Sequence, residues 1–136
     1  MDVGTATEAI SWWAVLVAAV SMFVLGGAWY GALFARRWQE LVGLSDDAVA
    51  AGTARVFGVA GIASLVIAGV LGLFIGADAG VADAALAGLL AGLGWVAPAL
   101  AMSYVFARRP TGLTVIDAGY HVLAFTLAAA VLGWLG

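Results

Sequence analysis

Four long runs of apolar residues, separated by short polar segments, make up most of the chain. The first extends from Ile10 to Phe34 without a charged residue, and as a helix it would rise about 37 Å at roughly 1.5 Å per residue. That length exceeds the hydrocarbon core of a bilayer, which is about 30 Å thick. The pattern predicts an all-α fold, a single-domain four-helix transmembrane bundle, with spans near residues 10–34, 56–76, 81–106 and 115–135.

The polar segments predict where the helices begin and end. Residues 1–8 are interpreted as a polar tail, and residues 38–43 as a polar turn in which Trp38 anchors at the membrane interface. Ser45 precedes two aspartates, the pattern of a hydroxyl N-cap followed by acids in the first helical turn. We therefore expect a helix to start there and to carry an inner-side extension, residues 46–55, ahead of the second span.

The basic residues indicate the orientation in the membrane. They lie only in the first and third connections, at Arg36, Arg37, Arg55, Arg108 and Arg109. With four spans these two connections share one side, which the positive-inside bias makes cytoplasmic. We therefore expect a multi-pass protein of the cell membrane with both termini outside. The residues before the first span include no lysine or arginine, so we expect this helix to be retained rather than cleaved.

A short internal repeat accompanies this layout. Phe-Ala-Arg-Arg at residues 34–37 recurs at 106–109, and Gly-Leu-Ser at 43–45 is echoed by Gly-Leu-Thr at 112–114. Both pairs occur where an odd-numbered span ends and an even-numbered one begins. This indicates a parallel two-plus-two repeat of helical hairpins. The alternative is that any inner helix end tends to be aromatic and basic.

Composition narrows the possible functions. The chain is 65% hydrophobic and only 10% charged, against roughly 25% charged in soluble domains, so lipid must be its solvent. Five arginines without a lysine make nucleic acid an improbable partner. Without cysteine there is no disulfide framework or cysteine-ligated metal, and the single histidine, His121, cannot build a histidine-rich metal site. We expect no cofactor and no metal.

Small residues spaced four apart predict close helix packing. In lipid, association depends on backbones approaching closely at such positions. They form one stripe on each of the first three spans: Gly27 and Gly31; Ala68, Gly72 and Gly76; Ala84, Gly88 and Gly92. Whether these stripes meet within one chain or between copies is left open by the pattern.

Asp117 and His121 are four apart in the fourth span and share one face of a helix. Ionisable residues within a span are candidates for function, and a carboxylate one turn from an imidazole can orient it for proton transfer. With Tyr30 they form the candidate proton or ligand site. The structural alternative is that residues 114–117 form a capping box, which would place Asp117 in the first helical turn.

Trp29, Trp95 and Pro98 lie within the spans rather than at their ends, and they are candidates to line a cavity. A buried indole N–H needs a hydrogen-bond partner, although both tryptophans can instead pack against glycines. Proline removes one backbone hydrogen bond, so we expect a kink at Pro98. Tyr104 and Tyr120 fall near the inner interface and are interpreted as belt residues.

Two regions resemble a known family. The first is residues 23–44, with Gly27, Trp29-Tyr30, Phe34, Trp38 and Gly43. The second contains Gly92-Leu93-Gly94-Trp95, then Phe106, Arg109-Pro110 and Ile116-Asp117-Ala118-Gly119-Tyr120. Together they resemble the bacterial family labelled domain of unknown function 1761. The resemblance covers nearly the whole chain and implies a small integral membrane protein with four spans and no assigned activity.

Three functions compete. Small-residue helix faces and the scarcity of polar groups in the spans favour a non-catalytic membrane protein that self-assembles as a homo-oligomer or serves a membrane-protein partner as an accessory subunit. The alternative is an oligomeric small-solute or proton permease or channel, with Asp117 and His121 near its inner vestibule. An enzyme is disfavoured, because Ser64 and Ser103 lack a nearby histidine and acid and no catalytic motif is present.

The arginine distribution makes a direct prediction about topology. In this cysteine-free chain, single cysteines replacing Arg36 and Arg108 should react with a membrane-impermeant thiol reagent from the same, cytoplasmic side. A cysteine replacing Asp78, in the second connection, should react from the opposite side. Labelling of positions 36 and 108 from opposite faces would overturn the orientation.

Overall fold

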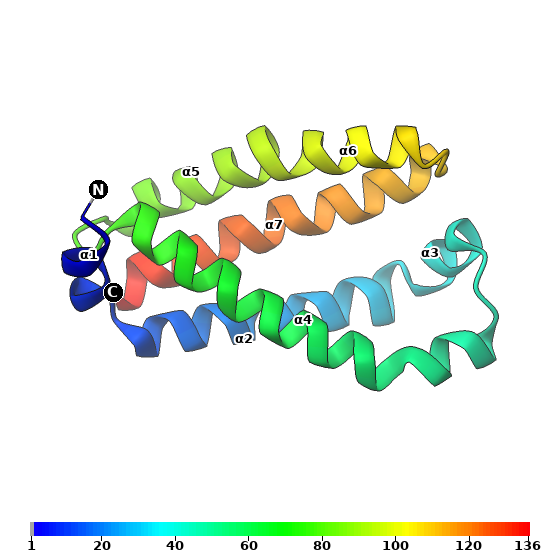
Figure 1. Cartoon of the computed structure of the whole chain (residues 1–136), viewed down its shortest axis with the longest axis horizontal. Coiled ribbons are helices and arrows are strands. Elements are labelled where there is room, and N and C mark those ends of the chain that lie inside the picture. Colours follow the sequence, from blue (N-terminus) through cyan, green and yellow to red (C-terminus); the bar gives the residue numbers. More distant parts are fainter. Residues whose placement is uncertain (1) are drawn as a thin grey trace.

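Four helical rods run side by side along the long axis of the molecule (Figure 1). The computed structural model describes residues 2–136. Within them, the helices long and apolar enough to cross a membrane are Trp12–Leu33, Asp46–Ile75, Val81–Phe106 and Thr111–Leu135. The all-α architecture with four membrane-length helices is therefore as predicted. The N- and C-terminal ends lie together at one end of the bundle, opposite the short helix α3 (Figure 1).

The first rod begins later than the hydropathy pattern predicted. Residues expected as a polar tail form helix α1 (Val3–Ala9), whose start is capped by the Asp2 side chain accepting from the Gly4 N–H. The chain then breaks at Ile10, and the Ser11 side chain caps α2 (Trp12–Ala28). The tail prediction was wrong because a capping aspartate is enough to start a short helix.

The first rod ends in a π-helical segment, η1 (Trp29–Leu33), followed by α3 (Ala35–Val42). The predicted polar turn at 38–43 was therefore wrong for all but its last residue, Gly43, which stops α3 in the left-handed conformation at φ 79°. Helix α3 forms because its apolar face has a surface to cover. Leu41 lies against α7, where a Cβ built on Gly112 would be 3.1 Å from its Cδ1.

Helix α4 (Asp46–Ile75) starts as predicted, with the Ser45 side chain accepting from the Ala48 N–H. Its C-terminal half packs against α2 and α7 and buries Ser64, Ala68, Leu71 and Gly72. Its N-terminal half diverges from α2, so the two rods separate toward the α3 end (Figure 1). Side chains in the first turns of α4 are consequently exposed.

The third rod consists of α5 (Val81–Ala91), the π-helical segment η2 (Gly92–Val96) and α6 (Ala97–Phe106). The irregularity expected at Pro98 thus takes the form of widened turns directly before it. A tight corner with Arg108 at φ 58° leads into α7 (Thr111–Leu135). Helix α7 begins four residues before the predicted span at 115, and it contacts all three of the other rods.

The closest packing in the bundle joins α5 to α7 through small residues. A Cβ built on Gly88 would contact the Phe125 carbonyl oxygen and lie 2.5 Å from the Ala129 Cβ. A Cβ on Gly133 would lie 2.6 Å from that of Ala84. Backbones this close leave no room for a methyl group at these positions. Such close approach of small residues is the main source of contact between helices in lipid.

The predicted small-residue stripes are therefore used differently. Residues Ala84, Gly88 and Gly92 are buried against α7, and Ala68 and Gly72 are buried in the core, whereas Gly76 is exposed. Gly27 and Gly31 are exposed, and their Cβ positions have no neighbour within 4 Å in the described part of the chain. One stripe thus remains uncovered on the first rod.

The α5–α7 contact predicts a specific cost for one methyl group. Gly88→Ala should lower the free energy of unfolding by about 1–3 kcal/mol, because the new Cβ meets backbone that cannot yield. The matched control is Gly61→Ala in α4, where the Cβ position is open and alanine favours the helix. Thermal unfolding in detergent measures both, and equal stability of the two variants would contradict the packing.

Candidate functional site

A buried carboxylate lies where three elements meet α7. Asp117 is 8% exposed and accepts hydrogen bonds from three side chains. Its Oδ1 accepts from the Tyr30 hydroxyl (2.7 Å) and the Trp38 Nε1–H (3.1 Å). Its Oδ2 accepts from the Tyr104 hydroxyl (2.6 Å). The donors come from η1, α3 and α6, so one side chain of α7 connects the first rod, the helix after it and the third rod.

The π-helical segment η1 presents two neighbouring aromatic residues to α7. While Tyr30 bonds Asp117, the Trp29 Nε1–H donates to the Ile116 carbonyl oxygen at 3.0 Å. The Trp29 ring lies over Gly119, where a built Cβ would be 3.3 Å from the indole Cζ2. A side chain at position 119 would crowd this ring. Glycine there is explained by the indole, and π-helical turns of this kind are frequent at functional sites.

Aromatic rings surround the carboxylate. Tyr30 packs edge-on against Trp38, with ring centroids 5.8 Å apart, and against Tyr120 at 5.3 Å. The Tyr120 hydroxyl donates to the Met22 carbonyl oxygen at 2.9 Å, which ties α7 to the middle of α2. We call Trp29, Tyr30, Trp38, Tyr104, Asp117 and Tyr120 the Asp117 cluster.

Within the described residues, no cationic side chain forms an ion pair with Asp117, although Arg109 lies within electrostatic range of Tyr104. In the described part of the chain, the one ion pair between side chains joins Arg37 to Glu40 at 3.5 Å on the surface. Hydrogen bonds to a charged acceptor are stronger than neutral ones and compensate part of the cost of burial. Oδ1 accepts two of them and Oδ2 only one, so Oδ2 retains one free acceptor position.

His121 lies one turn further along α7 but does not bond Asp117, so the expected orientation of the imidazole by the carboxylate was wrong. Its Nδ1 is buried and has no hydrogen-bond partner among residues 2–136. The ring instead contacts Tyr120 and Phe125, at centroid distances of 5.1 and 6.5 Å. The carboxylate accepts instead from three donors on other elements.

The capping interpretation of Asp117 was also wrong. Helix α7 begins at Thr111, directly after Pro110, so Thr114 is already inside the helix and Asp117 lies beyond the first turn. Proline and the corner before it start the helix early. The carboxylate is turned inward to side-chain donors and caps no helix.

The candidate cavity-lining residues are separated in the structure. Trp29 belongs to the Asp117 cluster. Trp95 is 69% exposed and its ring faces Phe74 at a centroid distance of 6.4 Å, while Pro98 is exposed on α6. Neither contacts the cluster through a hydrogen bond or ring contact. Within residues 2–136, no three potential metal ligands come together.

The sequence interpretation missed Tyr104, Tyr120 and Trp38 as members of the cluster, because each was taken as an interface residue. One signal was available. The Trp-Tyr pair at 29–30 and the Ile-Asp-x-Gly-Tyr run at 116–120 are the more specific parts of the family resemblance. The structure shows that these two motifs bind each other.

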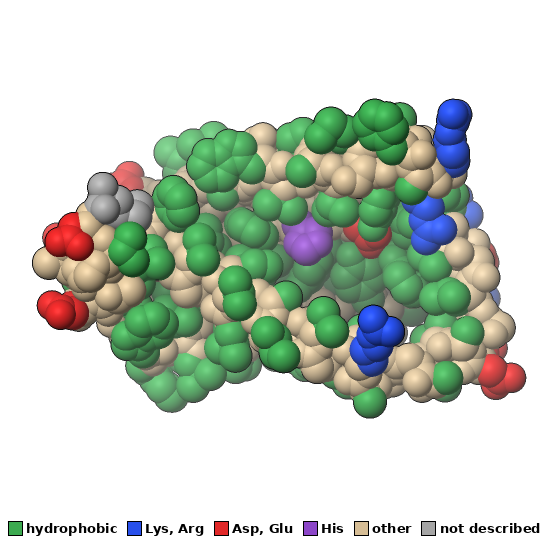
Figure 2. All heavy atoms as spheres, in the orientation of Figure 1, with side chains coloured by type: hydrophobic (Ala, Val, Ile, Leu, Met, Phe, Trp, Pro, Cys, Tyr) green, Lys and Arg blue, Asp and Glu red, His purple; other side chains and the backbone are tan. Residues whose placement is uncertain are grey.

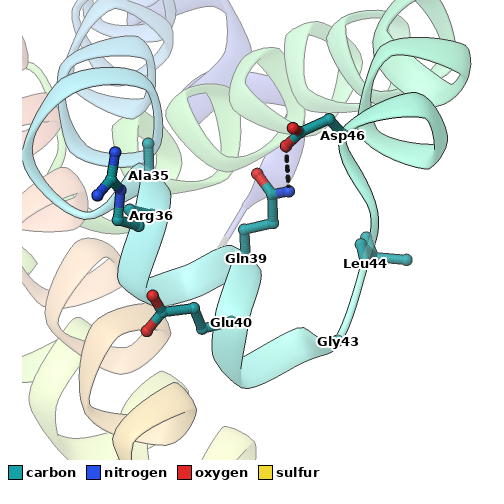
Figure 3. Close-up of a pocket in the computed structure, with 7 residues that line it drawn as sticks. All are labelled: Ala35, Arg36, Gln39, Glu40, Gly43, Leu44 and Asp46. Atoms are coloured by element: carbon teal, nitrogen blue, oxygen red, sulfur yellow. Dashed lines mark hydrogen bonds between the residues drawn. The ribbon is translucent and has the colours of Figure 1, made fainter.

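A separate cavity of about 500 Å³ lies between α3 and the start of α4 (Figure 3). Gln39 spans it, donating from Nε2 to the Asp46 Oδ1 at 2.6 Å. The remaining lining residues are Ala35, Arg36, Glu40, Gly43 and Leu44. This cavity exists because α4 diverges from the first rod, and it does not include the Asp117 cluster.

The hydrogen bonds to Asp117 predict a difference between two tryptophans. Trp38→Phe removes one N–H donor from a buried carboxylate and should lower the free energy of unfolding by about 1.5–3 kcal/mol. Trp95→Phe makes the same change on an exposed ring and should stay within about 0.5 kcal/mol. Thermal unfolding in detergent compares the two variants. A Trp38→Phe variant as stable as the control would show that the hydrogen bond does not contribute to the free energy of unfolding.

Comparison with known proteins identifies the family of the chain. Neither a curated protein nor a solved structure matches the chain. A family model described as a protein of unknown function (DUF1761) matches residues 13–133, a range that contains all four rods almost completely and every residue of the Asp117 cluster. The chain therefore belongs to the DUF1761 family of proteins of unknown function.

Proposed function

We propose that this chain is a non-catalytic integral membrane protein that works by self-assembly, as a homo-oligomer or as an accessory subunit of a membrane-protein partner. The observation that carries the proposal is the uncovered stripe of the first rod. Gly27 and Gly31 lie on one helix face, are exposed, and have open Cβ positions. Such a face allows another backbone to approach closely, which is the main source of helix association in lipid.

The neighbouring surface of α4 supports the same proposal. Its N-terminal half diverges from the first rod, and Gly52 and Gly58 there also have open Cβ positions within the described residues. Both rods therefore carry small residues with open Cβ positions near the region where they separate. A helix of a second copy seated against it would gain contacts that larger side chains would prevent.

The Asp117 cluster supports a structural role within the subunit. Its three donors fix η1, α3 and α6 around α7, so each subunit presents a defined surface to its partner. The cluster offers a carboxylate whose oxygens already accept hydrogen bonds, without a serine, threonine or cysteine nucleophile in it. We propose no enzymatic activity on this basis.

We propose the same membrane placement for the folded chain as for the sequence. We place the α3 end in the cytoplasm and the α1 end, with both termini, outside the cell membrane. The two Phe-Ala-Arg-Arg segments are found at the start of α3 and the end of α6, at the same end of the bundle. That placement supports two related hairpins running parallel to each other.

A second candidate function is an oligomeric small-solute or proton permease. The observation that favours it is the incompletely satisfied pair on α7, a buried carboxylate with a free acceptor position and a buried imidazole nitrogen without a partner. Unsatisfied buried polar groups call for an explanation, and an absent ligand or proton is one.

Self-assembly through the first rod is tested by making its stripe bulky. Gly27→Leu with Gly31→Leu should convert the oligomer in mild detergent to a single 13.7 kDa chain, while Gly94→Leu, also at an open position, should leave the assembly intact. Light scattering of the detergent complex and cross-linking in liposomes give the copy number. A wild-type protein that is monomeric in both settings would refute the proposal.

A further inference from the structure

We propose that the Asp117 cluster is a binding site for a small primary ammonium ion, R–NH3⁺, whose apolar substituent remains in the membrane. The inference names the ligand class for the second candidate function, but it concerns binding alone. It stands on the charge, the free acceptors, the aromatic rings and the access route of the cluster, and self-assembly of the chain is not required for it.

The charge of the site calls for a cation. Asp117 is buried in an apolar bundle with three neutral donors and no ion-pair partner among the described residues. Neutral donors stabilise a carboxylate but do not neutralise it. Ionisable groups within membrane spans are costly and are usually paired. A ligand that carries one positive charge would complete the site.

The free hydrogen-bonding positions match three donors. Asp117 Oδ2 has one acceptor position left, and the Tyr104 hydroxyl, which donates its proton to Oδ2, keeps its own oxygen lone pairs. His121 Nδ1 lacks a partner, and it is an acceptor when the neutral ring carries its proton on Nε2. A primary ammonium group has three N–H bonds, which three acceptors of this kind would satisfy.

Aromatic rings add a second attraction for a cation. Tyr30 packs edge-to-face with Trp38 and Tyr120, and His121 extends this series of rings to Phe125. A cation that lies within about 6 Å of the face of one of these rings gains roughly 0.5–2 kcal/mol of attraction. Aromatic surroundings therefore favour an organic cation over water, which gains little from the rings.

Access to the site is from the membrane side. Figure 2 shows a furrow along α7, between α5–α6 above and α4 below, with the single histidine on its floor and an acidic side chain beside it. Helix α4 scarcely touches α5, so the furrow is not closed over. Gly92 packs against Val122 on the other flank of His121, which leaves no room to enter there. Apolar side chains border the furrow and suit a short alkyl chain.

The experiment titrates the purified full-length protein in detergent with n-butylammonium by calorimetry. Wild type should bind it saturably. Asp117→Asn, which removes the charge, and His121→Leu, which removes one acceptor, should weaken binding roughly ten- to a hundredfold and severalfold, respectively. Asp83→Asn, at an exposed acid in the first turn of α5, should bind as wild type does.

Competition identifies the ligand class. Potassium at equal ionic strength should not displace n-butylammonium, and tetramethylammonium, which has no N–H donor, should bind more weakly. Displacement by potassium would replace the proposal with an inorganic cation site. Absence of saturable binding, or equal binding by wild type and His121→Leu, would overturn it.

Two measurements keep the test decisive. If Asp117→Asn does not fold, His121→Leu and Tyr104→Phe, each with its thermal unfolding midpoint recorded, still remove one acceptor each. The copy number of the detergent complex is measured on the same samples. A monomer that binds n-butylammonium would refute self-assembly and leave the site, whereas an oligomer that does not bind would do the reverse.

Discussion

The α3 end of this bundle depends on one buried carboxylate. A charge in an apolar bundle must be surrounded by donors, and Asp117 takes them from η1, α3 and α6. To deliver Trp38, the chain has to fold back as a helix after the first rod. To deliver Tyr30 beside Trp29, the last turns of that rod adopt the wider π-helical geometry. The irregular end of the first rod therefore follows from the position of a single side chain.

Elsewhere the rods are held by a different means. Apolar side chains gain little by exchanging lipid for one another, so α5 and α7 approach until glycine and alanine backbones touch. Where neither close contact nor a polar network is available, as along the N-terminal half of α4, the helix separates from its neighbours. The exposed first-rod stripe and the divergent α4 are two consequences of the same limited attraction in lipid.

The two proposals use different surfaces. Assembly is assigned to Gly27 and Gly31 and to the N-terminal half of α4, and cation binding to the furrow along α7. The cluster nevertheless connects them, because η1 carries both Gly31 and Tyr30. A ligand that binds Asp117 would act on η1 through the Tyr30 hydrogen bond, and η1 also forms part of the proposed subunit contact. Ligand binding could in this way change the assembly of the subunits.

The sequence by itself determined the four membrane-length helices, the start of α4 at its Ser45 cap and the family. Span length, hydropathy and capping depend on residues that are close together in the sequence, so they can be predicted from the sequence alone. Only the tertiary structure decided that residues 38–42 are helical, that Asp117 caps nothing, and which small-residue stripe is covered. Trp38 and Tyr30 reach Asp117 across 79 and 87 positions of sequence, and local patterns carry no information about partners so distant.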